Sequence, residues 1–189
     1  SPIFMSMNKQ KAEASKKNLQ NSDLKNTDLQ EADLSDGVLI NAYLENSNLS
    51  EADLCGADLS GASLINARLH RTILYRCRAK EADFSNATLT QANLVESNFS
   101  SANFNNSNLK ESNIEGANLI NTNFINANLS EVNLTGVFFK QSETWSHSTL
   151  LYRNTVITNN TTIKIYTTSW CGPCKMAKKF LTEKGYRFE

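Results

Sequence analysis

The sequence of 189 residues has no apolar run long enough to cross a bilayer, and its N-terminus lacks the apolar core of a secretory signal. We therefore expect a cytoplasmic chain that makes no membrane contact. The net charge at pH 7 is zero, from 19 basic and 19 acidic residues, and such a balance disfavours direct nucleic-acid binding. Only one Cys-x-x-Cys pair is present, without a second pair of ligands, so we expect no metal site and no cofactor.

The central tract also lacks the apolar periods of a helix and of a flat strand, which are about 3.6 and 2 residues. A large apolar residue recurs instead at every fifth position from Leu19 to Phe139, as the centre of twenty-five units, and only Ala79 is a small centre. Two positions before each centre stands a compact residue, which is Ala in twelve units. If both residues point inward, the other three face water, and each unit forms one side of a coil with a turn at its corner.

A unit of five residues cannot bury its own leucine, so neighbouring units must stack and share one core. The segments EADLS, CGADLS, GANLI and NANLS resemble the A-(D/N)-L-x-x motif of the pentapeptide repeat proteins. This resemblance implies an all-β fold, a right-handed quadrilateral β-helix with four units per coil and about six coils. Coils of four units predict an aromatic stack of Phe84, Phe104 and Phe124. They also align nine asparagines, at every fifth position from Asn93 to Asn133, and predict amide hydrogen bonds along the axis.

Acidic residues outnumber basic ones by fifteen to seven between Leu19 and Phe139. Coils of four units place two identical EADL segments one above the other, and like charges directly opposite each other destabilise a sheet. Arg71 is the local compensation that this register provides. We therefore predict an acidic patch formed by Glu31, Asp33, Glu51 and Asp53, whose missing positive charge is supplied by a partner. The alternative is that these carboxylates only keep a repetitive β surface soluble.

One coil holds most of the basic residues of the tract. It provides a candidate anion site formed by Arg68, Arg71, Arg76 and Arg78. The register also allows a structural interpretation, in which arginines pair with carboxylates of neighbouring coils and contribute a few tenths to about 1 kcal/mol each. The pairs predicted in this way are Arg71 with Glu51, Arg76 with Glu96, and Arg78 with Asp58.

Residues 163–189 have a different pattern, which indicates a strand, a Cys-bearing loop, a helix and a second strand. The segment YTTSWCGPCKMAKKFLTEKGY resembles the first βαβ unit of the glutaredoxin and thioredoxin family. The resemblance implies a small α/β appendage in which Cys171 is the nucleophilic thiolate and Cys174 resolves the mixed disulfide. Later strands of that family do not follow, and selective catalysis would need them. In the repeat register Cys77 points inward and Cys55 faces solvent, so we expect two unpaired thiols.

These patterns divide the chain into four segments: a polar leader or cap (1–16), the pentapeptide-repeat β-helix (17–140), a C-terminal cap or linker (141–162) and an incomplete glutaredoxin-like βαβ segment (163–189). The favoured function is a non-enzymatic scaffold that binds another protein, and open solenoid ends would also support a homodimer. Two alternatives stay open. Some pentapeptide repeat proteins are acidic rods that mimic DNA and inhibit a type II topoisomerase, and the Cys171–Cys174 pair suggests thiol-disulfide exchange.

Overall fold

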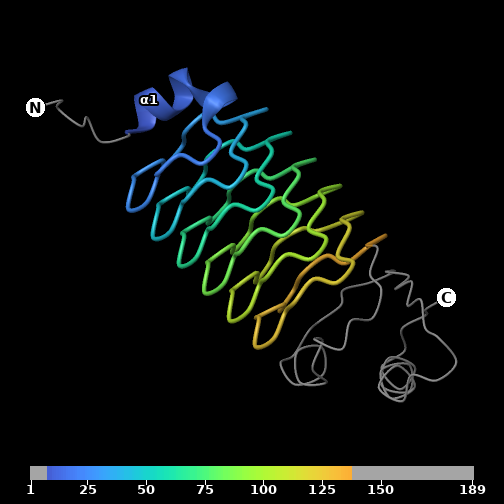
Figure 1. The fold of residues 1–189 in the computed structure, drawn as a ribbon. Coiled ribbons are helices and arrows are strands. Elements are labelled where there is room, and N and C mark those ends of the chain that lie inside the picture. The colour runs from blue at the N-terminus through green and yellow to red at the C-terminus, as the bar shows by residue number, and fades with distance from the viewer. Residues whose placement is uncertain (1–7, 138–189) are drawn as a thin grey trace, which may run out of the picture.

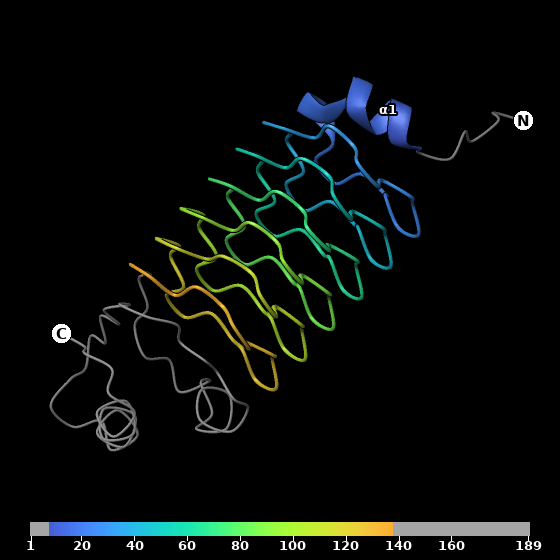
Figure 2. The same cartoon turned by 180° about the vertical axis from the view of Figure 1, so that it is seen from behind.

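The computed structural model describes residues 8–137, and the expected linker and glutaredoxin-like segment lie outside them. The described chain begins with helix α1 (Lys9–Ala14) and the 3-10 helix η1 (Lys16–Asn18). It then winds into coils that stack along one axis, with α1 over the first of them (Figures 1 and 2). Each side of a coil contributes one residue to isolated parallel bridges, so no long strand forms.

The bridges join residues twenty positions apart, from Asp23–Tyr43 to Asn113–Asn133, and all nineteen are parallel. This register confirms four units per coil. The first coil carries bridge residues 23, 28, 33 and 38, the second 43, 48, 53 and 58, and the third 63, 68, 73 and 78. We number the four walls in chain order: wall 1 contains 23, 43 and 63, wall 2 contains 28, 48 and 68, wall 3 contains 33, 53 and 73, and wall 4 contains 38, 58 and 78.

Backbone hydrogen bonds between coils use most of the N–H groups of each unit. In the unit centred on Leu44, Tyr43 donates to the preceding coil at 2.9 Å, and Leu44 and Asn46 donate to the following coil at 2.7 and 3.0 Å. Ala42 closes the preceding corner by donating to the carbonyl of Leu39 at 3.0 Å. The N–H after the centre, that of residue 45, takes no part in this pattern. Four of five amides therefore hold this unit to its neighbours, and the same pattern recurs through the middle coils.

The unit centres and the compact residues before them form one continuous core along the rod. Phe84 and Phe104 stack with ring centroids 4.7 Å apart, and Phe104 and Phe124 stack at 5.1 Å, which confirms the predicted aromatic stack. Phe99 meets Phe84 and Phe104 edge-on, at 5.8 and 5.4 Å. Phe99 follows Ala79 by one coil on wall 4, so a large ring stands next to the one small centre.

The corners require a left-handed backbone at the second residue after each centre. In the unit of Leu19, Asn21 has a φ of 57°, and Ser22 donates to the carbonyl of Leu19 at 3.1 Å, as in a type II turn. Four glycines and twenty other residues occupy this position, all with positive φ. Nine of the twenty are asparagine, which tolerates this conformation, but six are glutamate and two are arginine.

The predicted asparagine ladder is wrong. The Oδ1 atom of each of the nine asparagines from Asn93 to Asn133 accepts the N–H two residues later, at 2.9–3.1 Å. No hydrogen bond joins two of these amides along the axis within residues 8–137. The reason is local, because the N–H after each centre has no partner on a neighbouring coil and the short side chain reaches it. Aspartate does the same, as when Asp53 accepts from Cys55 at 2.9 Å.

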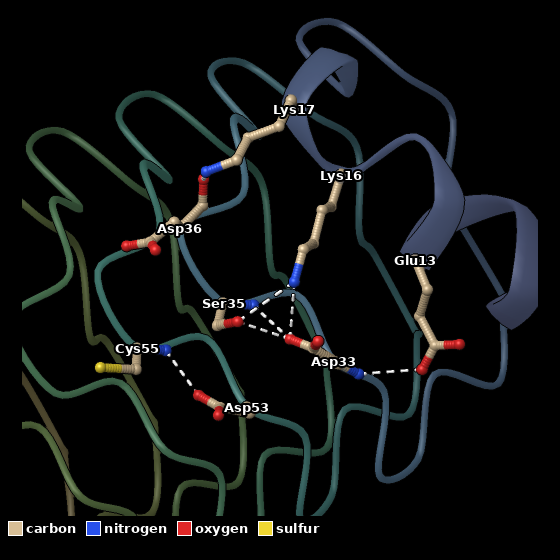
Figure 3. A network of polar contacts seen from close by, with 8 residues as sticks. All are labelled: Glu13, Lys16, Lys17, Asp33, Ser35, Asp36, Asp53 and Cys55. Carbon is tan, nitrogen blue, oxygen red and sulfur yellow. Dashed lines mark hydrogen bonds and ion pairs between the residues drawn. The ribbon is translucent and has the colours of Figure 1, made fainter.

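The N-terminal helices supply acceptors that the first coil would otherwise take from a preceding coil. Glu13 Oε1 accepts the N–H of Asp33 at 2.9 Å (Figure 3). The carbonyl of Lys16 accepts the N–H of Val38 at 2.7 Å. Both contacts lie at the edge of the first coil, on walls 3 and 4. The helices thereby complete part of an open β edge, which is a common route to unwanted association.

Candidate interaction surfaces

The structure brings the four predicted acidic residues together. Asp33 and Asp53 form a bridge on wall 3. Glu31 and Glu51 occupy the corner just before that wall in successive coils, with φ values of 58° and 60°. Glu31, Asp33 and Glu51 are exposed, and Asp53 is half-buried. The four carboxylates therefore form two adjacent rows, which we call the acidic patch.

The acidic patch has a compensating charge that sequence reasoning missed. Lys16 Nζ lies 2.8 Å from Asp33 Oδ1, and the same oxygen accepts from the backbone and hydroxyl of Ser35 (Figure 3). The hydrogen bond from Lys16, followed by those from Ser35, holds the pKa of Asp33 well below its usual range. The prediction that Arg71 alone compensates this patch is therefore wrong. Lys16 lies outside the repeats, so the coil register gave no reason to place it there.

Two of the three predicted pairs in the basic coil are present. Arg76 Nε lies 2.6 Å from Glu96 Oε2, and Arg78 Nε lies 3.0 Å from Asp58 Oδ2. The hydrogen bond with Glu96 raises the pKa of Arg76. Burial raises the pKa of Asp58, but hydrogen bonds from Ser60 and Arg78 together bring it below its usual value.

The third predicted pair does not form, because no ion pair joins Arg71 to Glu51 within the described part of the chain. The four arginines of the candidate anion site also do not converge. Arg68 lies on wall 2 and Arg78 on wall 4, which are opposite walls, and Arg71 and Arg76 lie at the two corners of wall 3 between them. The structure therefore spreads positive charge over walls 2, 3 and 4 of the third coil and gathers no single anion site.

Sequence reasoning also missed an exposed apolar residue in this coil. Ile73 lies on wall 3, where neighbouring coils carry Asp53 and Asn93, and it is 39% exposed. Tyr75 follows at the next corner, and the Arg76 guanidinium lies over its ring, 5.0 Å from the centroid. The signal was available, since isoleucine occupies an outward position of the repeat that is polar in the adjacent coils.

The cysteines of the rod are free, as predicted. Cys77 is buried, and burial raises the pKa of its thiol to about 12. Cys55 is half-buried at a corner of wall 3, and burial also raises the pKa of this thiol. Neither thiol is activated for nucleophilic chemistry. The candidate pair Cys171 and Cys174 lies outside the described residues.

Residues 8–137 contain neither a metal-binding cluster nor a membrane-spanning helix. They contain no group of three or more His, Cys, Asp or Glu residues arranged to hold a metal ion. The same residues include no helix with the length and hydropathy needed to span a bilayer.

A continuous core enclosed by four walls of parallel bridges defines the protein as a β-helix. Residues 10–39, 38–76, 80–116 and 102–141 match the family of Pentapeptide repeats, in eight copies. These ranges cover more than half of the chain, which therefore belongs to the pentapeptide repeat family, whose members form right-handed β-helices. Residues 163–189 match the Glutaredoxin family.

Several solved structures are similar to this chain. HetL, a pentapeptide repeat protein involved in heterocyst differentiation regulation in Nostoc sp. strain PCC 7120, is 28% identical, with 74% of this chain and 76% of that chain covered and a TM-score of 0.45. A pentapeptide repeat protein of Cyanothece 51142 is 34% identical, with coverages of 55% and 64% and a TM-score of 0.34. A trypsin-treated variant of QnrB1, a plasmid-mediated fluoroquinolone resistance protein, is 20% identical, with coverages of 65% and 78% and a TM-score of 0.38. No curated protein matches the chain.

Proposed function

We propose that the β-helix is a non-enzymatic scaffold that binds another protein through the acidic patch. The supporting observation is the stacking of Glu31 with Glu51 and of Asp33 with Asp53 at the spacing of neighbouring coils, roughly 4.8 Å. Within residues 8–137, only Asp33 among these four has an ion pair. Basic side chains of a partner would relieve the repulsion among the other carboxylates, and such complementarity favours specific association.

The backbone of the rod suits a binding surface of this kind. Along the middle of the rod, the N–H and carbonyl of each bridge residue bond to the preceding coil, and its two sequence neighbours bond to the following coil. The bridge side chains therefore project from fixed rows. The core is formed by other residues, the unit centres and the compact residues before them. Outward side chains can therefore vary in charge without disturbing the core, and a preorganised surface lowers the entropy cost of binding.

Affinity capture with the full chain tests this function through two matched variants. Glu51→Gln with Asp53→Asn removes two charges from the acidic patch, and the asparagine still accepts the N–H of Cys55. Glu81→Gln with Asp83→Asn makes the same change in an identical EAD segment on wall 1. We expect the first variant to lose the captured protein and the second to retain it. Equal capture by both variants, or no captured protein, would contradict the proposal.

Thiol-disulfide exchange is a second candidate, supported by the match of residues 163–189 to the Glutaredoxin family. The Cys171 thiolate would attack a substrate disulfide and form a mixed disulfide. Cys174 would then attack the sulfur of Cys171, which releases the reduced substrate and leaves Cys171 and Cys174 joined as a disulfide. Reduction of insulin or of a mixed disulfide measures this activity, with Cys171→Ser as the control. Full activity in the Cys171→Ser protein would end this candidate.

Mimicry of DNA has less support from the charge distribution. A duplex carries one negative charge per roughly 1.7 Å of axis, without interruption. Between Leu19 and Phe139 the rod has fifteen acidic and seven basic residues, and the third coil spreads arginine over walls 2, 3 and 4 at its middle. A supercoiling assay with purified type II topoisomerase separates this function from the scaffold, since unchanged supercoiling at a large molar excess excludes it.

A further inference from the structure

The third coil presents an apolar strip between two arginines on wall 3. Arg71 occupies the corner before the wall, with a φ of 56°, and Ile73 lies on the wall with 39% of its surface exposed. Tyr75 and Arg76 follow at the next corner, where the guanidinium lies over the ring and remains largely exposed. Across the wall, the outward side chains are therefore basic, aliphatic, aromatic and basic.

The preceding coils of the same wall carry the opposite charge. Ile73 forms a bridge with Asp53, and Glu51 occupies the same corner as Arg71 one coil earlier. No ion pair joins Glu51 to Arg71 within residues 8–137. Wall 3 thus offers a carboxylate and a guanidinium one coil apart, and both are available to another molecule.

The only other exposed large apolar residue of the described chain lies on the opposite wall and has a cation over its ring. Tyr43, on wall 1, is 47% exposed, and Lys25 Nζ lies over its ring, 5.4 Å from the centroid. A cation over an aromatic face satisfies such a residue within its own chain. Ile73 is aliphatic, so a cation of its own chain cannot cover it in the same way. Its side chain leaves water only when another surface packs against it.

We propose that wall 3 is a self-association surface, through which two copies pack side by side and in opposite directions. The two-fold axis lies in the interface, perpendicular to both rods, and passes between the second and third coils. This operation places Arg71 of each copy against Glu51 of the other, so the same ion pair forms twice. Ile73 of each copy lies beside the axis, opposite Asp53 of the other copy, and the two Ile73 side chains meet diagonally across the axis, which shields both from water.

A second copy fits this surface because wall 3 carries both halves of the complementary charge pattern. The inference rests on the proposed interaction function and names a partner for the same wall. Contact is confined to one narrow wall with charged pairs at its edge, so the association depends on concentration and weakens with salt. It is also distinct from association through the ends of the solenoid, which would leave wall 3 free.

Sedimentation velocity of the full chain, with charge-reversed variants, tests the inference. Arg71→Glu and Glu51→Arg each place like charges together in the dimer, and we expect each to raise its dissociation constant about tenfold or more. An equimolar mixture of the two variants restores both intermolecular pairs, so we expect a heterodimer. Arg68→Glu makes the matched change on wall 2 of the same coil and is expected to leave dimerisation unchanged. Ile73→Asn, which installs the residue that the next coil carries at this position, should weaken it.

The mixture is decisive because it cannot repair anything within either chain. Thermal melts of each variant show whether it is folded before association is compared. A wild-type chain that stays monomeric at its highest soluble concentration overturns the inference, as does a mixture that associates no more tightly than its components. A monomer that still captures another protein through Glu51 and Asp53 leaves the scaffold function standing. A monomer that captures nothing overturns both.

Discussion

At the scale of single residues, the corner is the most demanding position of the repeat. It needs a left-handed backbone, which costs a residue other than glycine roughly 1 kcal/mol. Asparagine tolerates the left-handed backbone, but glutamate, arginine and serine also occur at this position, with φ values near those of Asn21 and Asn26. Outward corners therefore carry backbone strain at the same places where charge is displayed.

Ser101 and its neighbour Ser100 make this strain measurable. Ser101 has a φ of 58°, whereas Ser100 is not among the residues with positive φ. We expect Ser101→Gly to raise the free energy of unfolding by up to about 1 kcal/mol, and Ser100→Gly to lower it by roughly 0.5–1 kcal/mol. Urea denaturation measures both values. A loss of stability of similar size in the two variants would contradict the assignment of the corner.

The inward and outward positions of neighbouring units should respond differently to the same new charge. Leu89 is fully buried, and Leu89→Asp would leave an unpaired carboxylate in the core, which costs several kcal/mol and disrupts neighbouring coils. Asn93→Asp should change stability by less than about 1 kcal/mol, since its carboxylate can accept the N–H of Val95 as the amide does. Melting temperatures compare the variants, and similar values would refute the assignment.

At the scale of elements, the N-terminal helices hold the first coil through side chains as well as backbone. Lys16 Nζ reaches Asp33, and Lys17 Nζ donates to the carbonyl of Asp36 at 2.8 Å (Figure 3). One of these acceptors titrates and the other does not. The two lysines therefore provide a matched pair for separating charge from simple contact.

The pH dependence of stability follows from the pair of Lys16 and Asp33. The hydrogen bond with Lys16 holds the pKa of Asp33 below its value in the unfolded chain, so the pair adds stability above that value. This contribution is lost as the pH falls from the ordinary carboxyl range, about 4, toward the folded pKa. Lys16→Met should therefore be less stable than the wild type at neutral pH and approach it in acid.

Lys17→Met is the control for this experiment, because its acceptor is a backbone carbonyl that does not titrate. Its loss of stability should be the same at neutral and acidic pH. Urea unfolding at several pH values measures both variants against the wild type. A constant difference for Lys16→Met, parallel to that for Lys17→Met, would show that the ion pair does not contribute.

Sequence patterns predicted the contacts between residues one coil apart and missed the hydrogen bonds that a side chain makes with its own backbone. The twenty-residue register placed Phe84 on Phe104, and it paired Arg76 with Glu96, because both follow from residues one coil apart. It did not predict that the bridge asparagines bond to their own backbone, since an amide at that position can bond along the axis or to the N–H two residues later. Geometry decides this in favour of the nearby N–H, which lacks another partner.

For the acidic patch, too, the sequence predicted which residues stack but not every contact that they make. The stacked carboxylates of Glu31 and Glu51 follow from the register, and the structure places them together. The contact of Lys16 with Asp33 does not, because the helix that carries Lys16 is outside the repeat. The absence of an ion pair between Arg71 and Glu51 in the described residues depends on side-chain direction at a strained corner, which spacing alone does not determine.

At the scale of the whole molecule, a single coil divides the charge of the rod. Acidic residues dominate the first two coils, and the arginines of the third coil follow on walls 2, 3 and 4. The walls therefore differ in charge, although their backbone is the same. Each wall can therefore display its own set of side chains, because the backbone hydrogen bonds that hold it do not depend on the side chains of another wall.

The central claim is that coils of four units hold each other through backbone hydrogen bonds, and amide hydrogen exchange of residues 19–137 tests it directly. In units with a coil on each side, up to four of five N–H groups bond to a neighbouring coil or close a corner, and the N–H after each centre does not. We predict slow exchange with a period of five residues along the rod, and fastest exchange where that N–H lacks a side-chain acceptor, as at Glu45. Uniformly fast exchange through the middle of the chain, or protection without this period, would contradict the account.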